Sequence, residues 1–172
     1  MNLDNADLLG GEFSVSFNFF SWWHINAGCN VFYTTLSGKY GPNIIKRSHF
    51  AYTANIQNKI QLPAGIGLLI SGYYRSKLPD VMGTYMVRYF IDLAINKKIM
   101  KNKGKLIFKI SDVLNTYRYG LDLVGVDDKG YEYNQSNSRK NESQYFILSF
   151  VYNFEGKEKQ KKKRELLLRK VW

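Results

Sequence analysis

The sequence of 172 residues is poor in the residue types that most metal proteins and many enzymes need. It contains one cysteine, Cys29, and two histidines, His24 and His49. One cysteine excludes a disulfide framework and a multi-cysteine zinc cluster, and two histidines without a third ligand at a recognisable spacing favour no metal site. Phosphate-binding and dinucleotide glycine motifs, GxSxG and HExxH are also absent. We therefore expect no catalytic residues, no metal and no cofactor.

Long uncharged apolar runs are lacking as well. A membrane-spanning helix needs about 18 such residues, and no stretch of this sequence approaches that length. A membrane β-barrel is not disfavoured by this, because its strands need only about 9 to 11 residues and alternate apolar with polar ones. Proline is scarce, whereas aromatic residues make up 16% of the chain. This composition excludes a disordered or linker-like protein.

Positive charge is concentrated at one end of the chain. The formal net charge is +11, and more than half of the excess lies in residues 156–172. We expect these residues to form a basic tail, disordered or as a short helix, after a domain over residues 1–155. The tail could bind nucleic acid through its cations, or anionic headgroups with its leucines and Trp172 as an apolar anchor. A solvated tail with no nucleic-acid partner is the interpretation we favour.

Alternation of apolar and polar residues at period two dominates the rest of the sequence. Between Glu12 and Phe19 the odd positions are apolar and the even positions are polar. Seven segments follow this pattern, and they lie within 12–19, 23–35, 52–60, 66–75, 87–96, 105–111 and 143–154. We predict an all-β fold, an antiparallel up-and-down meander of about seven long strands that forms part of a transmembrane β-barrel.

The connections between these segments alternate in length. Short ones lie at 20–22, 62–65 and 101–104, and each is rich in turn-forming residues. Longer polar ones are predicted at 36–48, at 76–83 and within 117–142, where VDDKG at 126–130 suggests the tip of a protruding hairpin. In a meander this puts all short turns at one edge of the sheet and all long loops at the other, as in outer-membrane barrels.

Two classes of protein share this alternation, and the sequence leaves both open. In a soluble barrel the apolar face points inward, whereas in a membrane barrel it meets lipid. Predicted strands of about 10 to 15 residues exceed the usual soluble length, and Trp and Tyr gather near strand ends as interfacial residues do. These features favour the membrane barrel. The rival hypothesis is a small soluble antiparallel β-barrel that binds a lipophilic ligand in an apolar interior.

The alternation also predicts two sets of site residues. The apolar set on the last strand is expected to face lipid and consists of Phe146, Leu148, Phe150, Tyr152 and Phe154. The polar set is expected to form a lumen-facing wall and consists of Glu12, Lys59, Arg75, Arg88, Asp92 and Lys109. Arg88 with Asp92, or Glu12 with a lysine, could contact a substrate, but a plain polar wall is the simpler interpretation. Parity places Cys29 on the apolar face as a small filler.

Three segments carry a resemblance to a known family. They are NLDNADLLGGEFSVSFNFFSWWHIN, KLIFKISDVLNTYRYG and SQYFILSFVYNF with the lysine-rich tail after it. Together they resemble the C-terminal part of TonB-dependent receptor-like outer-membrane β-barrel proteins of the Bacteroidetes type, in particular the outer membrane protein beta-barrel family. In ISDVLNT an Asn-containing turn follows the penultimate strand, and the last strand is similar to the aromatic-ended pattern read by the barrel-assembly machinery. The family's terminal Phe lies near the end, whereas 18 residues follow Phe154 here.

The resemblance implies a place in the cell outer membrane and uptake of a scarce nutrient by the intact receptor. Its implied partners are outer-membrane lipid, the remaining strands and plug of a larger barrel, and the barrel-assembly machinery. The TonB system would be contacted only through N-terminal parts that are not recognisable in this sequence. The short turns and the basic tail would be periplasmic. Because seven strands do not close a barrel of even strand number, we expect a fragment that does not transport alone.

Overall fold

The computed structural model describes residues 2–40, 43–80, 83–126 and 130–154, which are almost entirely in antiparallel strands. Seven strands form one sheet in the order β1-β2-β3-β4-β7-β8-β11. They are β1 (Asn2–Phe20), β2 (Trp23–Tyr40), β3 (Asn43–Leu62), β4 (Ile66–Arg75), β7 (Arg88–Ile99), β8 (Gly104–Ser111) and β11 (Tyr145–Tyr152). Every neighbouring pair is antiparallel. The predicted all-β meander of about seven strands is confirmed.

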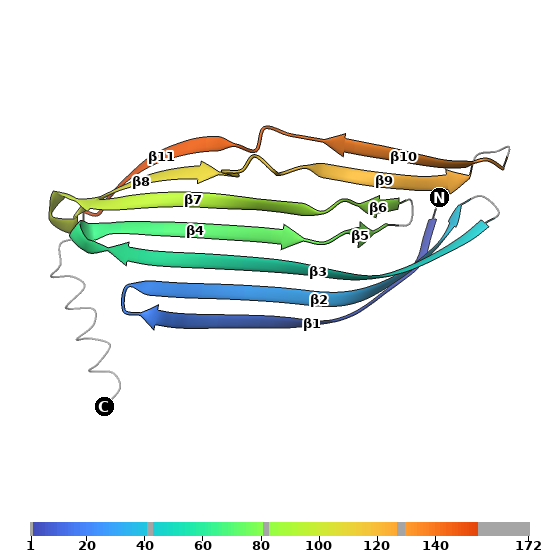
Figure 1. Cartoon of the computed structure of the whole chain (residues 1–172), viewed down its shortest axis with the longest axis horizontal. Coiled ribbons are helices and arrows are strands. Elements are labelled where there is room, and N and C mark those ends of the chain that lie inside the picture. The colour runs from blue at the N-terminus through green and yellow to red at the C-terminus, as the bar shows by residue number, and fades with distance from the viewer. Residues whose placement is uncertain (1, 41–42, 81–82, 127–129, 155–172) are drawn as a thin grey trace, which may run out of the picture.

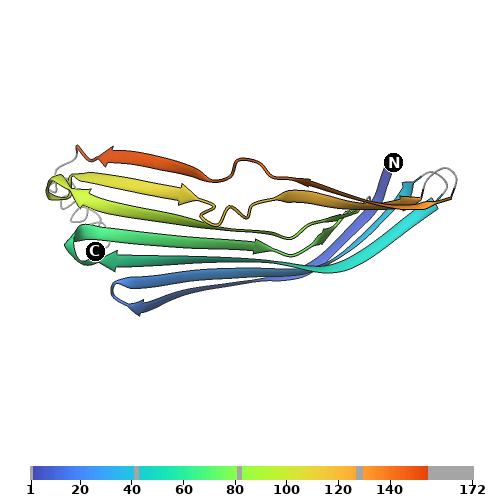
Figure 2. The same cartoon turned by 45° about the horizontal axis from the view of Figure 1, so that its top comes forward.

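A second sheet extends the first at one end. It consists of β5 (Leu78–Pro79), β6 (Gly83–Tyr85), β9 (Tyr119–Val126) and β10 (Glu132–Arg139), in the order β10-β9-β6-β5. Figures 1 and 2 show that these strands lie beyond β4, β7, β8 and β11 and continue them past short breaks. The hairpin predicted within 117–142 is therefore confirmed as β9–β10. Most of its predicted tip, residues 127–129, lies outside the described residues.

The short turns gather at the opposite end of the main sheet (Figure 1). A two-residue turn joins β1 to β2, and the 3-10 turns η1 (Pro63–Gly65) and η2 (Met100–Asn102) join β3 to β4 and β7 to β8. Ala64 and Lys101 have φ of 60° and 53°, in the left-handed region that such tight reversals use. The three predicted short connections are confirmed.

The prediction of a long loop at residues 36–48 is wrong. β2 continues to Tyr40 and β3 begins at Asn43, with these two residues in register. The segment lacks strict alternation, but ladder hydrogen bonds join backbone groups and do not require it. The predicted loop at 76–83 likewise contains β5 and the first residue of β6. The strands are thus longer than their alternating parts.

The main sheet is one curved layer and is not closed. Within the described residues β1 pairs only with β2 and β11 only with β8, so both are edge strands of this sheet. Among the described residues Ala51 is the only buried hydrophobic side chain, whereas large apolar side chains such as Phe13 are 68% exposed. The apolar face encloses no interior there, which gives the soluble-barrel hypothesis no support. No helix in the described part of the chain is long and apolar enough to cross a membrane.

Candidate functional site on a two-faced sheet

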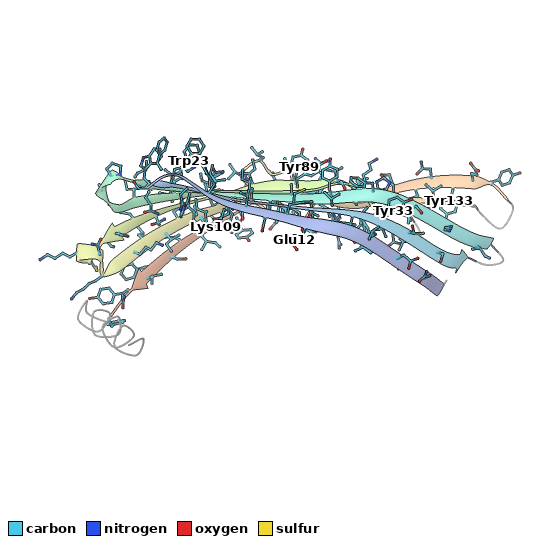
Figure 3. All side chains as sticks on the ribbon, turned by 90° about the horizontal axis from the view of Figure 1, so that it is seen from below. Glu12, Trp23, Tyr33, Tyr89, Lys109 and Tyr133 are labelled. Carbon is cyan, nitrogen blue, oxygen red and sulfur yellow. The ribbon has the colours of Figure 1, made fainter. Side chains whose placement is uncertain are left out.

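Strand register sorts the side chains into a polar and an apolar face, because directly paired residues of antiparallel strands point to the same side. One polar row crosses five strands and consists of Glu12, Asn30, Thr53, Arg75 and Arg88. Lys59, Asp92 and Lys109 lie on the same side by strand parity. Figure 3 shows Glu12 and Lys109 on the concave side of the sheet. The structure thus places all six residues of the predicted polar wall on the concave face. That this face borders a lumen stays a prediction.

The opposite, convex face carries apolar rows that cross the main sheet. One of its rows crosses six strands and consists of Trp23, Ile60, Leu68, Ile95, Phe108 and Leu148. Figure 3 shows Trp23 and Tyr89 on this side. The polar Asn58 lies among these residues, and its side-chain oxygen accepts a hydrogen bond from the indole Nε1 of Trp23 at 3.3 Å. The apolar surface is therefore not interrupted by an unpaired carbonyl at this position.

The predicted lipid-facing residues of the last strand belong to this convex face. Phe146, Leu148 and Phe150 pair with Ile110, Phe108 and Leu106 of β8. Leu148 is 70% exposed. Tyr152 ends the strand, and Phe154 follows it with 90% exposure. Their contact with lipid and their role as an assembly signal stay predictions.

Aromatic rings mark both ends of the convex face. At the short-turn end Phe19, Phe20, Trp22 and Trp23 form a cluster with neighbouring ring centroids 5.1 to 6.1 Å apart. At the other end tyrosines occupy four successive strands of the sheet, and these are Tyr33, Tyr52, Tyr74 and Tyr89. Tyr and Trp are enriched where a membrane meets water, since one end of each ring system is apolar and the other polar.

The spacing and stagger of these two aromatic belts fit a tilted membrane barrel. Trp23 and Tyr33 are ten residues apart on β2, about 33 Å along the strand. The row of directly paired residues that contains Tyr89 of β7 reaches β2, three strands away, at Cys29. The tyrosine of β2 is Tyr33, so the tyrosine belt shifts by four residues along the strands over this distance. With strands about 4.8 Å apart, this shift corresponds to a tilt of about 40°. That tilt reduces 33 Å to about 25 Å, the height of the apolar band of outer-membrane barrels.

A buried carboxylate ties the strands together where the main sheet gives way to its extension. Asp112, 2% exposed, follows β8. Its Oδ1 accepts a hydrogen bond from the backbone N–H of Thr116 at 2.9 Å. Its Oδ2 accepts one from the backbone N–H of Tyr117 at 2.9 Å and one from Ser143 Oγ at 2.6 Å. Ser143 lies in the break between β10 and β11, so Asp112 fastens the base of the β9–β10 hairpin.

The same cluster reaches the neighbouring strand β7. The backbone N–H of Asp112 donates to Asp92 Oδ1 at 3.0 Å, and Asp92 Oδ2 forms an ion pair with Lys109 Nζ at 3.0 Å. Asp92 and Lys109 were predicted as members of a polar wall, with Asp92 and Arg88 together as an alternative substrate contact. In the structure they also connect β7 and β8 to the Asp112 turn.

Stability in acid is expected to depend on Asp112. Burial raises the pKa of this carboxyl, but the hydrogen bonds from Ser143, Tyr117 and Thr116 outweigh burial and hold the pKa below its ordinary value. Because the unfolded value is about 3.9, the stabilising contribution is fully present above about pH 5 and is lost as pH falls through the folded pKa. We expect the unfolding temperature in detergent to fall less between about pH 5 and pH 3 for Asp112→Asn than for the native protein. Equal shifts would contradict this role.

Two arginines occupy the concave face beside a group of aromatic rings. Arg88 lies 5.6 Å from the ring centroid of Tyr73 and 5.5 Å from that of Tyr117, and Arg75 lies 5.8 Å from that of Tyr85. At these distances a guanidinium is attracted to the face of an aromatic ring. The pKa of Tyr85 is raised to about 12, chiefly by its hydrogen bond with Tyr119 and then by burial. Tyr85 therefore stays neutral at physiological pH.

The comparison with protein families gives one match that covers most of the chain. Residues 1–152 match the model of the outer membrane protein beta-barrel family. The chain belongs to this family. Neither the comparison with curated proteins nor that with solved structures gives a significant match. Membership indicates a membrane barrel protein of the outer membrane.

In this outer membrane barrel sequence the Asn-containing turn lies where the resemblance implied. Asn115 has φ of 54° and follows β8, the penultimate strand of the main sheet. Asp112 has φ of 47° in the same turn. Asp and Asn tolerate this region better than other residues, because their short side chains bond to the local backbone. The turn thereby redirects the chain into β9.

The structure does not bring the histidines of the barrel protein together. His24 pairs with Lys59, and His49 pairs with Thr34, ten residues further along β2. No group of three or more possible metal ligands occurs among the described residues. Cys29 is half-buried on the convex face between Phe13 and Ala54, as parity predicted.

Sequence reasoning missed several members of the concave site. Tyr73 shares its parity with Arg75, and this signal could have placed it beside the arginine. Asp112 and Tyr117 lie outside the alternating segments, and Ser143 is the first residue of the last one, so the periodic signal does not bring the three together. Their proximity follows from the return of the chain through β9 and β10.

Proposed function

We propose that the chain forms part of the wall of an outer-membrane TonB-dependent receptor-like transporter and contributes strands and outer loops to nutrient uptake. The observation that carries this proposal is the single-layer sheet with an apolar convex face, a polar concave face and two unpaired edges. The TonB-dependent part is supported by the three segments that resemble such receptors.

The unpaired edges require further strands if the sheet lies in a membrane. In hydrocarbon an unpaired backbone N–H or C=O costs several kcal/mol, because no water replaces the missing partner. β1 and β11 each present one such edge in the described sheet. We therefore propose that the remaining strands of a larger barrel pair with both, and that a plug occupies the space on the concave side.

The proposed orientation follows from the two kinds of connection. Outer-membrane barrels have short periplasmic turns and longer outer loops. The turn between β1 and β2, η1 and η2 would then be periplasmic, and the β9–β10 hairpin would project outward. The proposed periplasmic tail, 156–172, lies outside the described residues.

The proposed partners of this segment are structural. The convex face would contact outer-membrane lipid, and the last strand with its aromatic residues would be read by the barrel-assembly machinery. The TonB system would act through other parts of the receptor. We propose no catalytic activity and no nucleic-acid partner for the chain.

The two halves of the proposal are tested separately in cells that make the protein. We expect the chain to stay in the membrane fraction after extraction with carbonate and high salt and to need detergent for release. A monodisperse protein in plain buffer would overturn the membrane location. Nutrient uptake by the receptor is expected to stop when its TonB partner is deleted, and unchanged uptake would overturn the TonB-dependent part alone.

A further inference from the structure

Two positive charges face each other on the concave side of the sheet. Arg75 of β4 and Arg88 of β7 are directly paired across neighbouring strands. Like charges at opposed positions destabilise a sheet. Among the described residues neither guanidinium has a carboxylate within ion-pair distance, and Asp92 on the same face forms its ion pair with Lys109. This arrangement is unfavourable unless something else neutralises it.

The hydrogen-bonding capacity of the two arginines is also mostly unused. The side chain of Arg75 makes no hydrogen bond to a described residue, whereas that of Arg88 bonds weakly from Nη1 to Tyr117 Oη at 3.4 Å and also interacts with the hydroxyl of Tyr73. The Nε atoms of both are buried and have no partner within the described part of the chain. A guanidinium carries five donors in a planar fork that matches the oxygens of a carboxylate or sulfate. The remaining Nη donors of the two guanidiniums are therefore available to an oxyanion.

A flat aromatic surface adjoins the arginine pair. Tyr73 and Phe90 are stacked with ring centroids 5.3 Å apart, and Phe90 meets Tyr117 edge-on at 5.7 Å. A hollow of about 330 Å³ opens beside Phe90 and Tyr117. Its other lining residues include Asp92, Asp112 and Glu142 but neither arginine, so the acidic group of a ligand is expected at the arginines and not in this hollow. Faces of aromatic rings pack well against planar or ring-shaped groups. The surface can thus hold the body of a ligand whose charge lies at the arginines.

We propose that this part of the concave face binds a ring compound that carries a carboxylate or a sulfate. The oxyanion lies between Arg75 and Arg88, and the ring packs on the surface formed by Tyr73, Phe90 and Tyr117. An anion shared by both guanidiniums removes their repulsion and satisfies their donors, whereas a neutral ligand does neither and a cation is repelled. The inference rests on the proposed function, since a ligand reaches this face only if it borders a barrel lumen.

The test measures equilibrium binding to the protein purified in detergent. The probes are galacturonate and benzoate as acidic rings, galactose as the neutral counterpart of the first, and inorganic sulfate as an oxyanion without a ring. We expect at least one acidic ring to bind and galactose not to bind. Galacturonate and benzoate distinguish an acidic sugar from an aromatic acid. Sulfate binding as tight as that of both acidic rings would overturn the role of the aromatic surface.

Variants connect the binding to the named residues. Arg75→Gln and Arg88→Gln are each expected to weaken binding of the acidic ring by about tenfold or more. Lys59→Gln is the matched control, because it removes a positive charge from the same face on a neighbouring strand, away from the aromatic surface. It is expected to change binding by less than about twofold. Equal effects of all three variants would indicate general charge attraction and would overturn the site.

The outcomes separate this inference from the proposed function. Binding of an acidic ring compound in detergent does not require TonB. If the protein binds this compound but uptake proceeds without TonB, the result counts against the proposed function only. No binding of any acidic probe to folded protein, with TonB-dependent uptake intact, overturns the inference only.

Discussion

Replacement of Ile56 by arginine is expected to destabilise the membrane-inserted protein by about 2 to 4 kcal/mol. Ile56 lies midway along the apolar part of β3, four residues from Tyr52 and four from Ile60, and is 44% exposed on the convex face. If this face meets lipid, the guanidinium enters hydrocarbon near the bilayer midplane, where arginine costs this much in membrane barrels. The measurement is unfolding by urea from lipid vesicles.

The matched control is the next residue of the same strand. Gln57 points to the concave side and pairs with Asn26 and with Ser71, the partner of Asp92. Arginine at position 57 is therefore expected to change stability by less than about 0.5 kcal/mol. A larger loss for Gln57→Arg than for Ile56→Arg would reverse the assignment of the two faces. Leu148→Arg with Ser149→Arg applies the same comparison to the last strand.

The faces of the sheet were predictable because a single layer imposes period two over long distances. From Glu12 to Phe19, and again along β3 and β7, each side of the strand meets one environment, so alternation alone assigns each side chain to a face. The three short turns were equally accessible, since residues such as Pro63 and Gly65 favour a tight reversal. Both signals are local in sequence.

Strand ends were not predictable from the same signal. The ladder between β2 and β3 runs on to Tyr40 and Asn43, where backbone pairing persists although the side chains no longer alternate. The last strand departs from alternation as well, because Ile147 and Val151 place apolar groups on the concave side opposite Lys109 and Lys105. Alternation of apolar and polar residues marks a strand only where its two faces carry different side chains. Where both faces carry side chains of one type, it does not show where the strand ends.

The composition of the site depends on register, which alternation leaves open. Parity predicts that Arg75 and Arg88 share a face, but their direct pairing depends on the length of the β5–β6 excursion between them. The contact of Asp112 with Ser143 joins residues 31 positions apart. A single sequence specifies such contacts only through the complete path of the chain.

Replacement of Asp112 by alanine is expected to destabilise the protein by about 3 kcal/mol. The substitution leaves the backbone N–H groups of Thr116 and Tyr117 and the hydroxyl of Ser143 without their acceptor. Each buried donor that loses a charged partner costs about 1 to 3 kcal/mol, and partial access of water to the turn lowers the total. The measurement is thermal unfolding in detergent, with hydrogen exchange at residues 112–118 and 140–145 to locate the opening.

A second aspartate provides the control for this experiment. Asp122 Oδ1 accepts a hydrogen bond from Ser136 Oγ at 2.7 Å within the β9–β10 hairpin, in an exposed position. Asp122→Ala removes the same kind of Asp–Ser bond where water replaces it at once, so we expect a change below about 0.5 kcal/mol. If both variants lose equal stability, the hairpin as a whole rather than the buried turn stabilises this end of the sheet. If only Asp112→Ala does, and exchange rises on both sides of the hairpin base, Asp112 is the connection that holds the outer extension to the main sheet.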